Sequence, residues 1–318
     1  MPTPVFLTID TELMWRHHAD GHDIDTIVER SLEPAGVGIG YQLEMMARHG
    51  LKGVFFVDPM PALIYGLEPI KRVVGAILEA GQDVQLHLHP NWTGANRDDR
   101  SIAAQSFELT DYSLAEQCEL IAGAADLLTA AGAPDPVAFR AGSYAASDDT
   151  IAALAELQFT YDSSHNGSEH PWPSALSLDA RQIAPVEHRG VIEVPVTLIE
   201  DRPDHLRHFQ ICALSSTEMR AALDHAIREH HGAVTIVGHG FELANRCGTR
   251  PNAVHVRRFE QLCRMLAERR GALPTAHFAD RPSLELGKDD QPLGPSVVRT
   301  GLRQAEQLWS NLVAERAA

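Results

Sequence analysis

The stretch Val84-Gln85-Leu86-His87-Leu88-His89-Pro90-Asn91-Trp92 joins an apolar run to two histidines that are two residues apart. A β-strand alternates its side chains between faces, so this pattern predicts a strand with both imidazoles on one face. Pro90 has no N–H for a sheet hydrogen bond, which predicts the end of the strand there. Two imidazoles at a strand end suit a metal ion, but two histidines solvating a sheet edge would give the same pattern. Carboxylates at the ends of other strands would favour the metal site.

The composition is that of an ordinary globular protein. The 318 residues are 44% hydrophobic and 22% charged, enough for one large α/β domain or two ordinary ones with a substantial core. The net charge of −16 argues against nucleic acid or an anionic membrane as a partner. The four cysteines are not closely spaced, which predicts free thiols in a reducing compartment. Because we see neither a signal peptide nor an apolar stretch of membrane-spanning length, we expect a cytoplasmic protein with no membrane insertion.

Apolar runs that predict strands alternate with capped or periodic segments that predict helices. Gly50 and Gly81 follow two of the periodic segments and predict helix ends. Two Ser-x-x-Glu capping boxes, at Ser113 and Ser215, predict helix starts. We expect residues 15–25 to form a long loop. The expected strands are 5–10, 53–57, 84–89, 137–140, 159–162, 191–198, 233–238 and 275–278.

This alternation predicts a parallel (β/α) barrel, in which the loops after the strands carry the catalytic groups. A doubly wound open sheet is the alternative, but it normally has a Gly-rich turn where this chain has Asp10-Thr11-Glu12-Leu13. We therefore predict a distorted parallel barrel of about seven strands in residues 1–285, and a linker and amphipathic helix in 286–318. We expect this helix to dock on the body or to form a homo-oligomer through one apolar face. That face contains Val298, Leu302, Ala305, Trp309 and Leu312.

Polar side chains collect just after the predicted strands. They are Asp10 and Glu12, His87 and His89, Arg140 and Tyr144, Asp162, and His239. One carboxylate and two imidazoles form a three-ligand site that leaves room for water and substrate on a zinc-like ion. A second carboxylate can take a proton from the water, and a histidine can donate one to the leaving group. Singly, Arg140 fits a surface ion pair and His239 a core residue, but their joint placement favours a catalytic metal site.

These motifs resemble those of the polysaccharide deacetylases with a NodB-homology domain. That family has a Thr-x-Asp-Asp motif, a His-x-x-x-His motif, an Arg-x-Pro-Tyr motif, a later Asp motif and a Leu-x-x-His motif. The matching stretches are Thr8-Ile9-Asp10-Thr11-Glu12, His87-Leu88-His89, Arg140-Ala141-Gly142-Ser143-Tyr144, Asp162-Ser163-Ser164 and Ile236-Val237-Gly238-His239. The Leu-His-Leu-His-Pro and Phe-Arg-Ala-Gly-Ser-Tyr forms are closest to the WalW-like branch, named for lipopolysaccharide biosynthesis.

The chain departs from the family pattern in three places. Thr11 stands at the family's second Asp, and the two histidines are two residues apart where the family has four. Asn91 occupies the family's second histidine position. Gly142 replaces the proline of the third motif, and Tyr144 comes one residue late. The residue that completes the metal site is therefore left open between Glu12, Asp10 and Asn91.

The resemblance implies a metal-dependent hydrolase that removes an acetyl group, N-acetyl rather than O-acetyl, from a saccharide. It implies one divalent metal ion, zinc first, with cobalt, manganese or iron as alternatives. The implied roles are Asp10 as general base with Arg140 as its partner, His239 as general acid oriented by Asp162, and Glu12, His87 and His89 as metal ligands. A backbone N–H near Ser143 or Tyr144 would help to bind the oxyanion. Trp92 and Trp172 would either stack on a sugar ring or pack their loops.

Two other functions fit the same residues. A related enzyme could act on a small non-sugar amide, and a closed pocket in place of an open groove would favour it. A catalytically inactive carbohydrate-binding barrel is the second alternative, and loss of metal binding would be its mark. Phosphoesterases with a His-x-His motif normally carry it on the first strand, so its position on the third strand disfavours that class.

Overall fold

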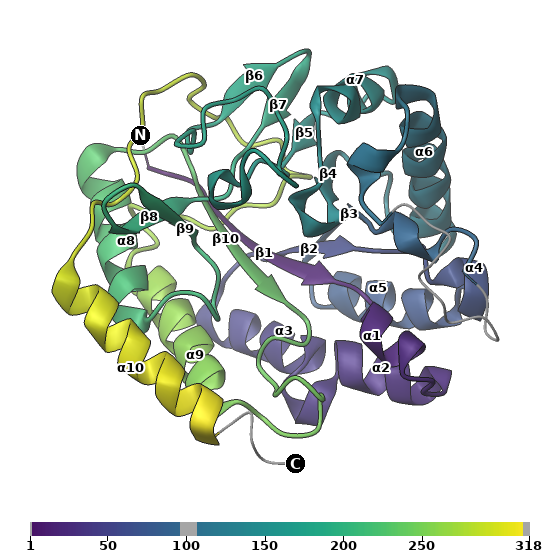
Figure 1. Cartoon of the computed structure of the whole chain (residues 1–318), viewed down its shortest axis with the longest axis horizontal. Coiled ribbons are helices and arrows are strands. Elements are labelled where there is room, and N and C mark those ends of the chain that lie inside the picture. Colours follow the sequence, from purple (N-terminus) through teal and green to yellow (C-terminus); the bar gives the residue numbers. More distant parts are fainter. Residues whose placement is uncertain (1, 96–106, 314–318) are drawn as a thin grey trace.

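The structure, a computed structural model, describes residues 2–95 and 107–313. Its central element is an eight-stranded curled sheet (Figure 1). The strands, in spatial order, are β10 (Val234–His239), β1 (Val5–Thr11), β2 (Val54–Val57), β3 (Asp83–Leu88), β4 (Ala138–Ala141), β5 (Tyr161–Asp162), β7 (Val191–Glu193) and β6 (Val186–His188). All neighbours in the sheet are parallel except β6 and β7. The seven parallel strands confirm the predicted (β/α) barrel type.

Helices surround the sheet (Figure 1). They are α1 (Trp15–Ala19), α2 (Ile24–Leu32), α3 (Ile39–His49), α4 (Ala62–Tyr65), α5 (Glu68–Glu79), α6 (Leu114–Ala130), α7 (Asp148–Glu156), α8 (Ser216–Glu229), α9 (Ala253–Glu268) and α10 (Val297–Val313). Both predicted capping boxes are formed, with Ser113 before α6 and Ser215 before α8. Gly50 ends α3 with the left-handed φ of 62° that its position predicts. No helix within 2–95 and 107–313 is both long and apolar enough to cross a membrane.

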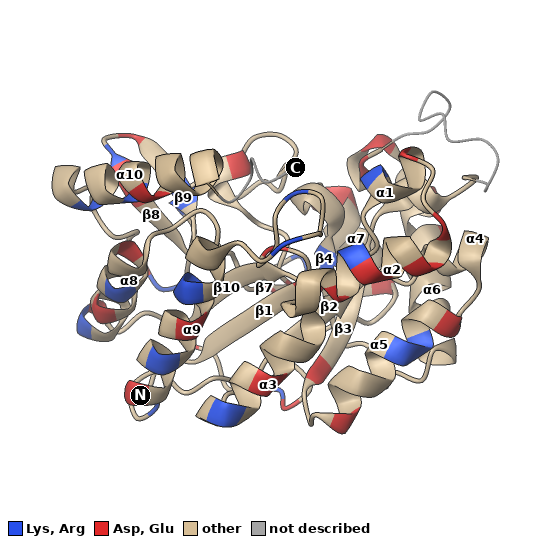
Figure 2. Cartoon of the chain, turned by 90° about the horizontal axis from the view of Figure 1, so that it is seen from below, with Lys and Arg blue, Asp and Glu red and all other residues tan. Residues whose placement is uncertain are grey.

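Side chains alternate between the two faces of the parallel strands, so the apolar residues form two cores. The outer core lies between the sheet and the helices, and the inner core lies on the other face of the sheet. One set of β1 side chains packs with the helices, while Phe6 points inward to a second cluster with Phe56 and Phe278. The rings of Phe6 and Phe278 stack with centroids 4.2 Å apart. On this inner face the guanidinium carbon of Arg140 lies 4.4 Å from the ring centroid of Phe56. Figure 2 shows the charged residues mainly on the surrounding helices and loops, while β1 and β10 are mostly tan.

Residues 15–25 do not form the loop that we expected. They contain α1 and lead into α2, whose first turn is capped by Asp23. The Asp23 carboxylate accepts a hydrogen bond from the backbone N–H of Thr26 at 2.9 Å. This cap and the apolar spacing of α2 are local signals that a sequence reading can use.

Three of the expected strands are also shorter than predicted, and the one expected over 159–162 is reduced to Tyr161–Asp162. The strand expected over 191–198 ends at Glu193, and the chain then leaves the sheet to form the antiparallel pair β8 (Leu198–Arg202) and β9 (His205–His208). The strand expected at 275–278 is reduced to one bridge between Thr275 and Val5. Phe278, the last residue of this expected strand, packs in the inner apolar core.

The helix α10 runs along the edge of the molecule beside α8 and α9 (Figure 1). It meets the body through polar side chains, not through its apolar face. Arg303 donates to Glu218 at 3.1 Å and to Asp201 at 2.7 Å, and the side chain of Ser310 bonds that of Asn252. The expected apolar docking on the chain's own body is therefore wrong. The boundary at residue 285 stays a prediction.

Candidate active site

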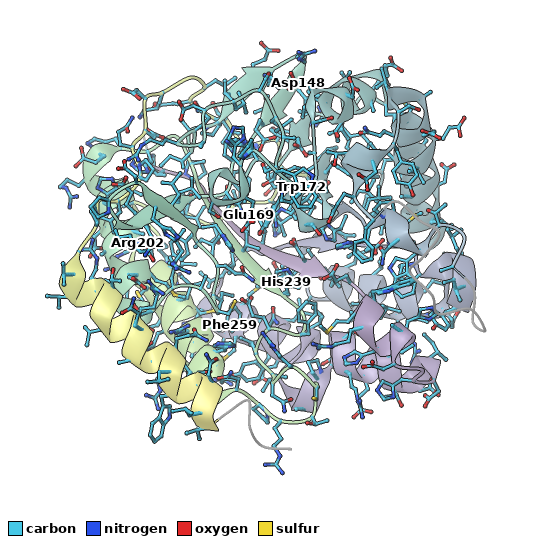
Figure 3. All side chains as sticks on the ribbon, in the orientation of Figure 1. Asp148, Glu169, Trp172, Arg202, His239 and Phe259 are labelled. Carbon is cyan, nitrogen blue, oxygen red and sulfur yellow. The ribbon has the colours of Figure 1, made fainter. Side chains whose placement is uncertain are left out.

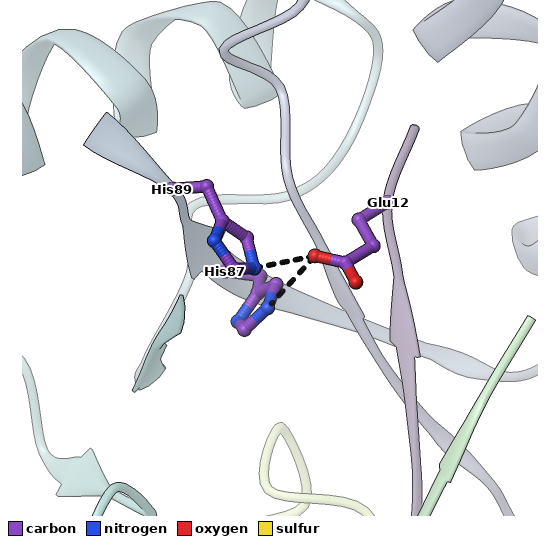
Figure 4. Close-up of side chains that lie close together, drawn as sticks. All are labelled: Glu12, His87 and His89. Carbon is purple, nitrogen blue, oxygen red and sulfur yellow. Dashed lines mark ion pairs between the residues drawn. The ribbon is translucent and has the colours of Figure 1, made fainter. Parts of the chain in front are cut away.

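Glu12, His87 and His89 meet at the C-terminal ends of β1 and β3 (Figure 4). One ligand atom from each lies within 4.8 Å of the others. The Oε2 atom of Glu12 is 3.7 Å from Nε2 of His87 and closer still to Nε2 of His89. Nδ1 of His87 lies 2.8 Å from the carbonyl oxygen of Arg140, which can only accept. Nδ1 therefore donates to this carbonyl, and Nε2 is the ring nitrogen that faces Glu12.

These three side chains, the metal triad, fit a divalent cation. Burial by itself would raise the pKa of Glu12, yet the charge of His89 and hydrogen bonds from both histidines hold it well below its usual range. Burial lowers the pKa of His89, but Glu12 raises it overall to about 9. The Glu12 carboxylate thus stabilises a positive charge at the place where a metal would lie. Two imidazoles and one carboxylate are a ligand set of catalytic zinc, which binds in competition with protons.

The approach of His89 to the triad requires a glycine at position 142. A Cβ on Gly142 would lie 2.4 Å from Nδ1 of His89. Ser143 and Tyr144 follow with positive φ angles of 55° and 60°, which are uncommon for residues with a Cβ. This strained turn ends β4 and brings both residues to the wall of the site cavity. The glycine that replaces the family's proline therefore has a packing reason in this chain.

Arg140 is fully buried and holds Asp10. Its Nη1 donates to Oδ1 of Asp10 at 2.7 Å and to the hydroxyl of Thr8 at 2.8 Å. Its Nε and Nη2 donate to the carbonyl and the hydroxyl of Ser163, both at 3.0 Å. The guanidinium thus has a partner on each side, and the Asp10 charge is compensated inside the barrel.

His239 lies between two carboxylates and pairs in register with Asp10 across β1 and β10. Its Nε2 is 3.9 Å from Oδ2 of Asp10, and its Nδ1 is 3.8 Å from Oε2 of Glu242. Burial lowers the pKa of His239, but Glu242 and Asp10 raise it overall to about 9. The two carboxylates therefore favour the charged form of the imidazole. Glu242, which the sequence reading missed, also accepts the backbone N–H of His239 at 3.0 Å.

The structure contradicts the expected role of Asp162 as the partner of His239. Asp162 lies on β5, far from β10 in the order of the sheet, and is paired in register with Glu193 of β7. Its carboxylate accepts from the hydroxyl of Ser164 at 2.7 Å, and Ser164 in turn accepts the N–H of Ala141 at 3.0 Å. Burial raises the pKa of Asp162, and burial with the Asp162 charge raises that of Glu193 well above its usual range. Asp162 therefore braces the end of β4.

The two tryptophans expected near the substrate lie in different environments. Trp92 is only 1% exposed, with its ring 4.9 Å from that of Trp15 and 5.5 Å from that of His18. Of the two roles expected for Trp92, the structure excludes sugar stacking, because its ring is buried against side chains of α1. Trp172, labelled in Figure 3, is 68% exposed. A contact between Trp172 and a sugar ring stays a prediction.

A further carboxylate near the triad was missed in the sequence. Asp58 follows β2 directly and is almost fully buried. Burial raises its pKa to about 6, although the charges of His89 and His87 oppose this shift. Its Oδ1 accepts the N–H of Met60 at 3.0 Å, while Oδ2 has no hydrogen-bond partner among the described residues. Asp58 directly follows an expected strand. The same signal identified Asp10 as a candidate site residue.

A cavity of about 160 Å³ opens over the site. It is lined by Asp10, Glu12, His87, His89, Ala141, Ser143, Tyr144 and His239. The structure thus brings together most of the predicted site residues, and it leaves Arg140, Asp162, Trp92 and Trp172 outside the cavity wall. A second group, His17, Asp20 and His22, also brings ligand atoms within 4.8 Å. In this second group, Nη1 of Arg30 lies 2.9 Å from Nε2 of His22, so that nitrogen already has a hydrogen-bond partner.

No protein-family model matches the chain, and no curated protein matches it. The structure is similar to that of a Mycobacterium smegmatis protein provisionally named a polysaccharide deacetylase. The TM-score is 0.56 at 19% identity, over 91% of this chain and 95% of that one. A family 4 carbohydrate esterase from Streptomyces lividans gives 0.43 at 13% identity, over 90% and 98%. The 4-alpha-glucanotransferase from Thermococcus litoralis gives 0.54 at 8% identity, over 93% of this chain and 42% of that one. The chain therefore has the curled parallel (β/α) barrel fold of the Mycobacterium smegmatis protein.

Proposed function

We propose that this protein is a metal-dependent deacetylase of the NodB-homology type that removes an N-acetyl group from a saccharide. One observation carries the proposal: the metal triad shares a single small cavity with Asp10, which is paired with the buried Arg140, and with His239, whose pKa is raised to about 9. This arrangement supplies three chemical groups that amide hydrolysis needs, namely a Lewis acid site, a base and an acid. The WalW-like branch and a cytoplasmic location are further proposals that rest on the sequence.

Each group in the cavity has a distinct task in the proposed reaction. A divalent ion held by Glu12, His87 and His89, most commonly zinc for such a ligand set, would supply Lewis acidity toward the acetyl carbonyl. Asp10, kept in place by Arg140, accepts the proton of the attacking water. His239 donates its proton to the departing nitrogen, which leaves poorly as an anion.

The charge on His239 favours an amide over an ester as the substrate. Glu242 and Asp10 hold the imidazole in its charged form, and this proton is the one that an amine leaving group requires. The site cavity of about 160 Å³ is smaller than the roughly 300–1,000 Å³ of typical ligand pockets. We therefore propose that only the acetyl amide enters it, while the rest of the saccharide lies outside.

Metal analysis combined with acetate release tests the proposal. Alanine at Glu12, His87 or His89 should lower the metal bound per chain, because each change removes a metal bond. Asp10→Asn should keep the metal and lose acetate release from an acetylated amino-sugar oligomer, because only the base is removed. His49→Ala, a histidine in the last turn of α3, is the matched control and should change neither quantity.

The opposite results would point to the alternatives. Full metal content in His89→Ala would show that another group completes the site. Release of acetate from a small acetyl amide but not from the oligomer would favour a small-amide hydrolase. Sugar binding without metal and without release would favour an inactive carbohydrate-binding barrel.

A further inference from the structure

The helix α10 exposes an unusual amount of apolar surface. Among the described residues, ten large hydrophobic side chains are exposed, and seven of them lie on α10. The outer face of α10 carries the exposed residues Val297, Val298, Gly301, Leu302, Ala305, Leu308, Trp309, Leu312 and Val313, with the uncharged Gln304 and Asn311 exposed along one side of it. Exposed apolar patches of this kind on a water-facing helix commonly mark an interaction site.

Each charged side chain of α10 contacts another part of the same chain. Arg303 pairs with Glu218 and Asp201, and Glu306 pairs with Arg258 at 3.0 Å. Arg299 donates to the carbonyl of Gly294 at 2.7 Å. The outer face therefore carries no charge, although the chain has a net charge of −16. A second copy can approach such a face without bringing like charges together.

Gly301 is a residue that the chain itself does not need. A glycine inside a helix costs roughly 0.5–1 kcal/mol relative to alanine. A Cβ at Gly301 would meet no atom within 4 Å, and its φ is not positive, so neither packing nor backbone requires it. A small residue on an exposed helix face serves close approach by another helix. Ala305, which lies four residues further along the same face, is small as well.

We propose that the outer face of α10 binds the same face of a second copy, as an antiparallel helix pair about a two-fold axis at Ala305. Trp309 and Gly301 each lie four residues from Ala305, on opposite sides. The pairing therefore places the largest side chain of each helix over the only glycine of the other. The same symmetry sets Val298 against Leu312. Self-complementary patches of this kind are what two-fold dimers require.

A lipid surface is the other apolar occupant that such a face could have. Helices that lie in a membrane interface normally present Lys or Arg to the headgroups. Both arginines of α10 are bound to the chain itself, and an acidic protein is repelled by anionic lipids. The observations thus favour a second copy.

Sedimentation equilibrium of the full chain tests the pairing. We expect a mass twice the chain mass of 34.8 kDa. Leu308→Glu should weaken the dimer roughly tenfold or more, because it buries an unpaired charge. Leu63→Glu is the matched control, since Leu63 is 55% exposed against 60% for Leu308 but lies on α4, and it should leave the dimer unchanged. Gly301→Leu should dissociate the dimer without lowering the melting temperature, because leucine is the better helix former.

Cysteine cross-linking tests the direction of the pair. Ala305→Cys should form a disulfide-linked dimer under mild oxidation, and Val298→Cys should not, because an antiparallel pair separates the two copies of residue 298. Cross-linking at both positions would make the pair parallel and overturn the proposed axis. A monomeric wild type, or a dimer that Leu308→Glu and Gly301→Leu leave intact, would overturn the pairing. A monomer that binds phosphatidylcholine vesicles would assign the face to lipid.

Discussion

Glu193, a fully buried residue behind the site, makes the stability of the fold depend on pH. Its pKa is raised well above the usual range by burial and by the charge of Asp162, so it keeps a proton that the unfolded chain releases. As pH rises above the unfolded value of about 4.3, the unfolded state binds fewer protons than the folded one. The free energy of unfolding therefore falls, by about 1.4 kcal/mol per pH unit for one proton, until the folded pKa is reached.

Glu193→Gln should remove this pH dependence. The glutamine can still accept the N–H of His165, which Glu193 accepts at 3.0 Å, and can donate to Asp162. We expect the variant to gain stability relative to wild type as pH rises from 5 to 8, measured by denaturant unfolding at each pH. If the free energies of unfolding of the two proteins differ by a constant amount across this range, the raised pKa of Glu193 is contradicted.

The partner of His239 can be identified by its effect on the pH–rate profile. Glu242→Gln removes one of the two negative charges that raise the pKa of His239 to about 9. We expect the basic limb of the profile for acetate release to move to lower pH. Asp162→Asn is the control and should leave the basic limb in place, because Asp162 pairs with Glu193 instead. A shift in Asp162→Asn but not in Glu242→Gln would restore the role expected from the sequence.

Gly142→Ala should weaken metal binding without unfolding the protein. The added Cβ would lie 2.4 Å from Nδ1 of His89 and push that ring out of the triad. Changes to groups that orient metal ligands typically lower metal affinity about 10- to 100-fold, and we expect an effect of that order in a competition titration. Gly75→Ala on α5, where a Cβ meets nothing within 4 Å, should leave the affinity unchanged and stabilise the helix. Equal affinities in the two variants would show that Gly142 does not set the position of His89.

The attachment of α10 depends on a buried ion pair at its inner side. Arg303 is 7% exposed and bridges Asp201 and Glu218. Arg303→Met leaves these carboxylates without that partner, so we expect the α10 amides to exchange roughly tenfold faster or more, with β1 and β10 unchanged. Arg299→Met is the control, because Arg299 lies on the same helix and donates to the backbone carbonyl of Gly294. Unchanged protection of α10 in Arg303→Met would show that other contacts hold the helix.

Helix ends were the best-predicted feature among the elements because their signals are local. Ser113, Ser215 and Gly50 each act on backbone groups within one turn. The same chemistry at Asp23 caps α2, whereas the lack of a clear apolar period in residues 15–25 predicts a loop. The pair β8 and β9 had no such signal, since its strands leave the sheet through contacts that are distant in sequence.

At the scale of the whole molecule, the sequence could predict which residues share the rim of the barrel but not which of them touch. Parallel strands put all their C-terminal ends at one edge, and this rule correctly brought Asp10, Glu12, His87 and His89 together. It failed for Asp162, because its carboxylate is bound by the hydroxyl of Ser164 and lies in register with Glu193 on the next strand. It also failed for Trp92, because a loop that folds inward looks the same in sequence as one that opens to solvent.

The pairing of the first strand with the last strand of the barrel also fixes a sequence of events during protein synthesis. All three members of the metal triad lie within the first 89 residues, whereas His239 and Glu242 lie far downstream. Synthesis runs from the N-terminus, so the triad residues are made first, then Arg140 and Gly142, which fix the positions of His87 and His89, and β10 last. Turnover would begin only when β10 inserts beside β1 and brings His239 opposite Asp10.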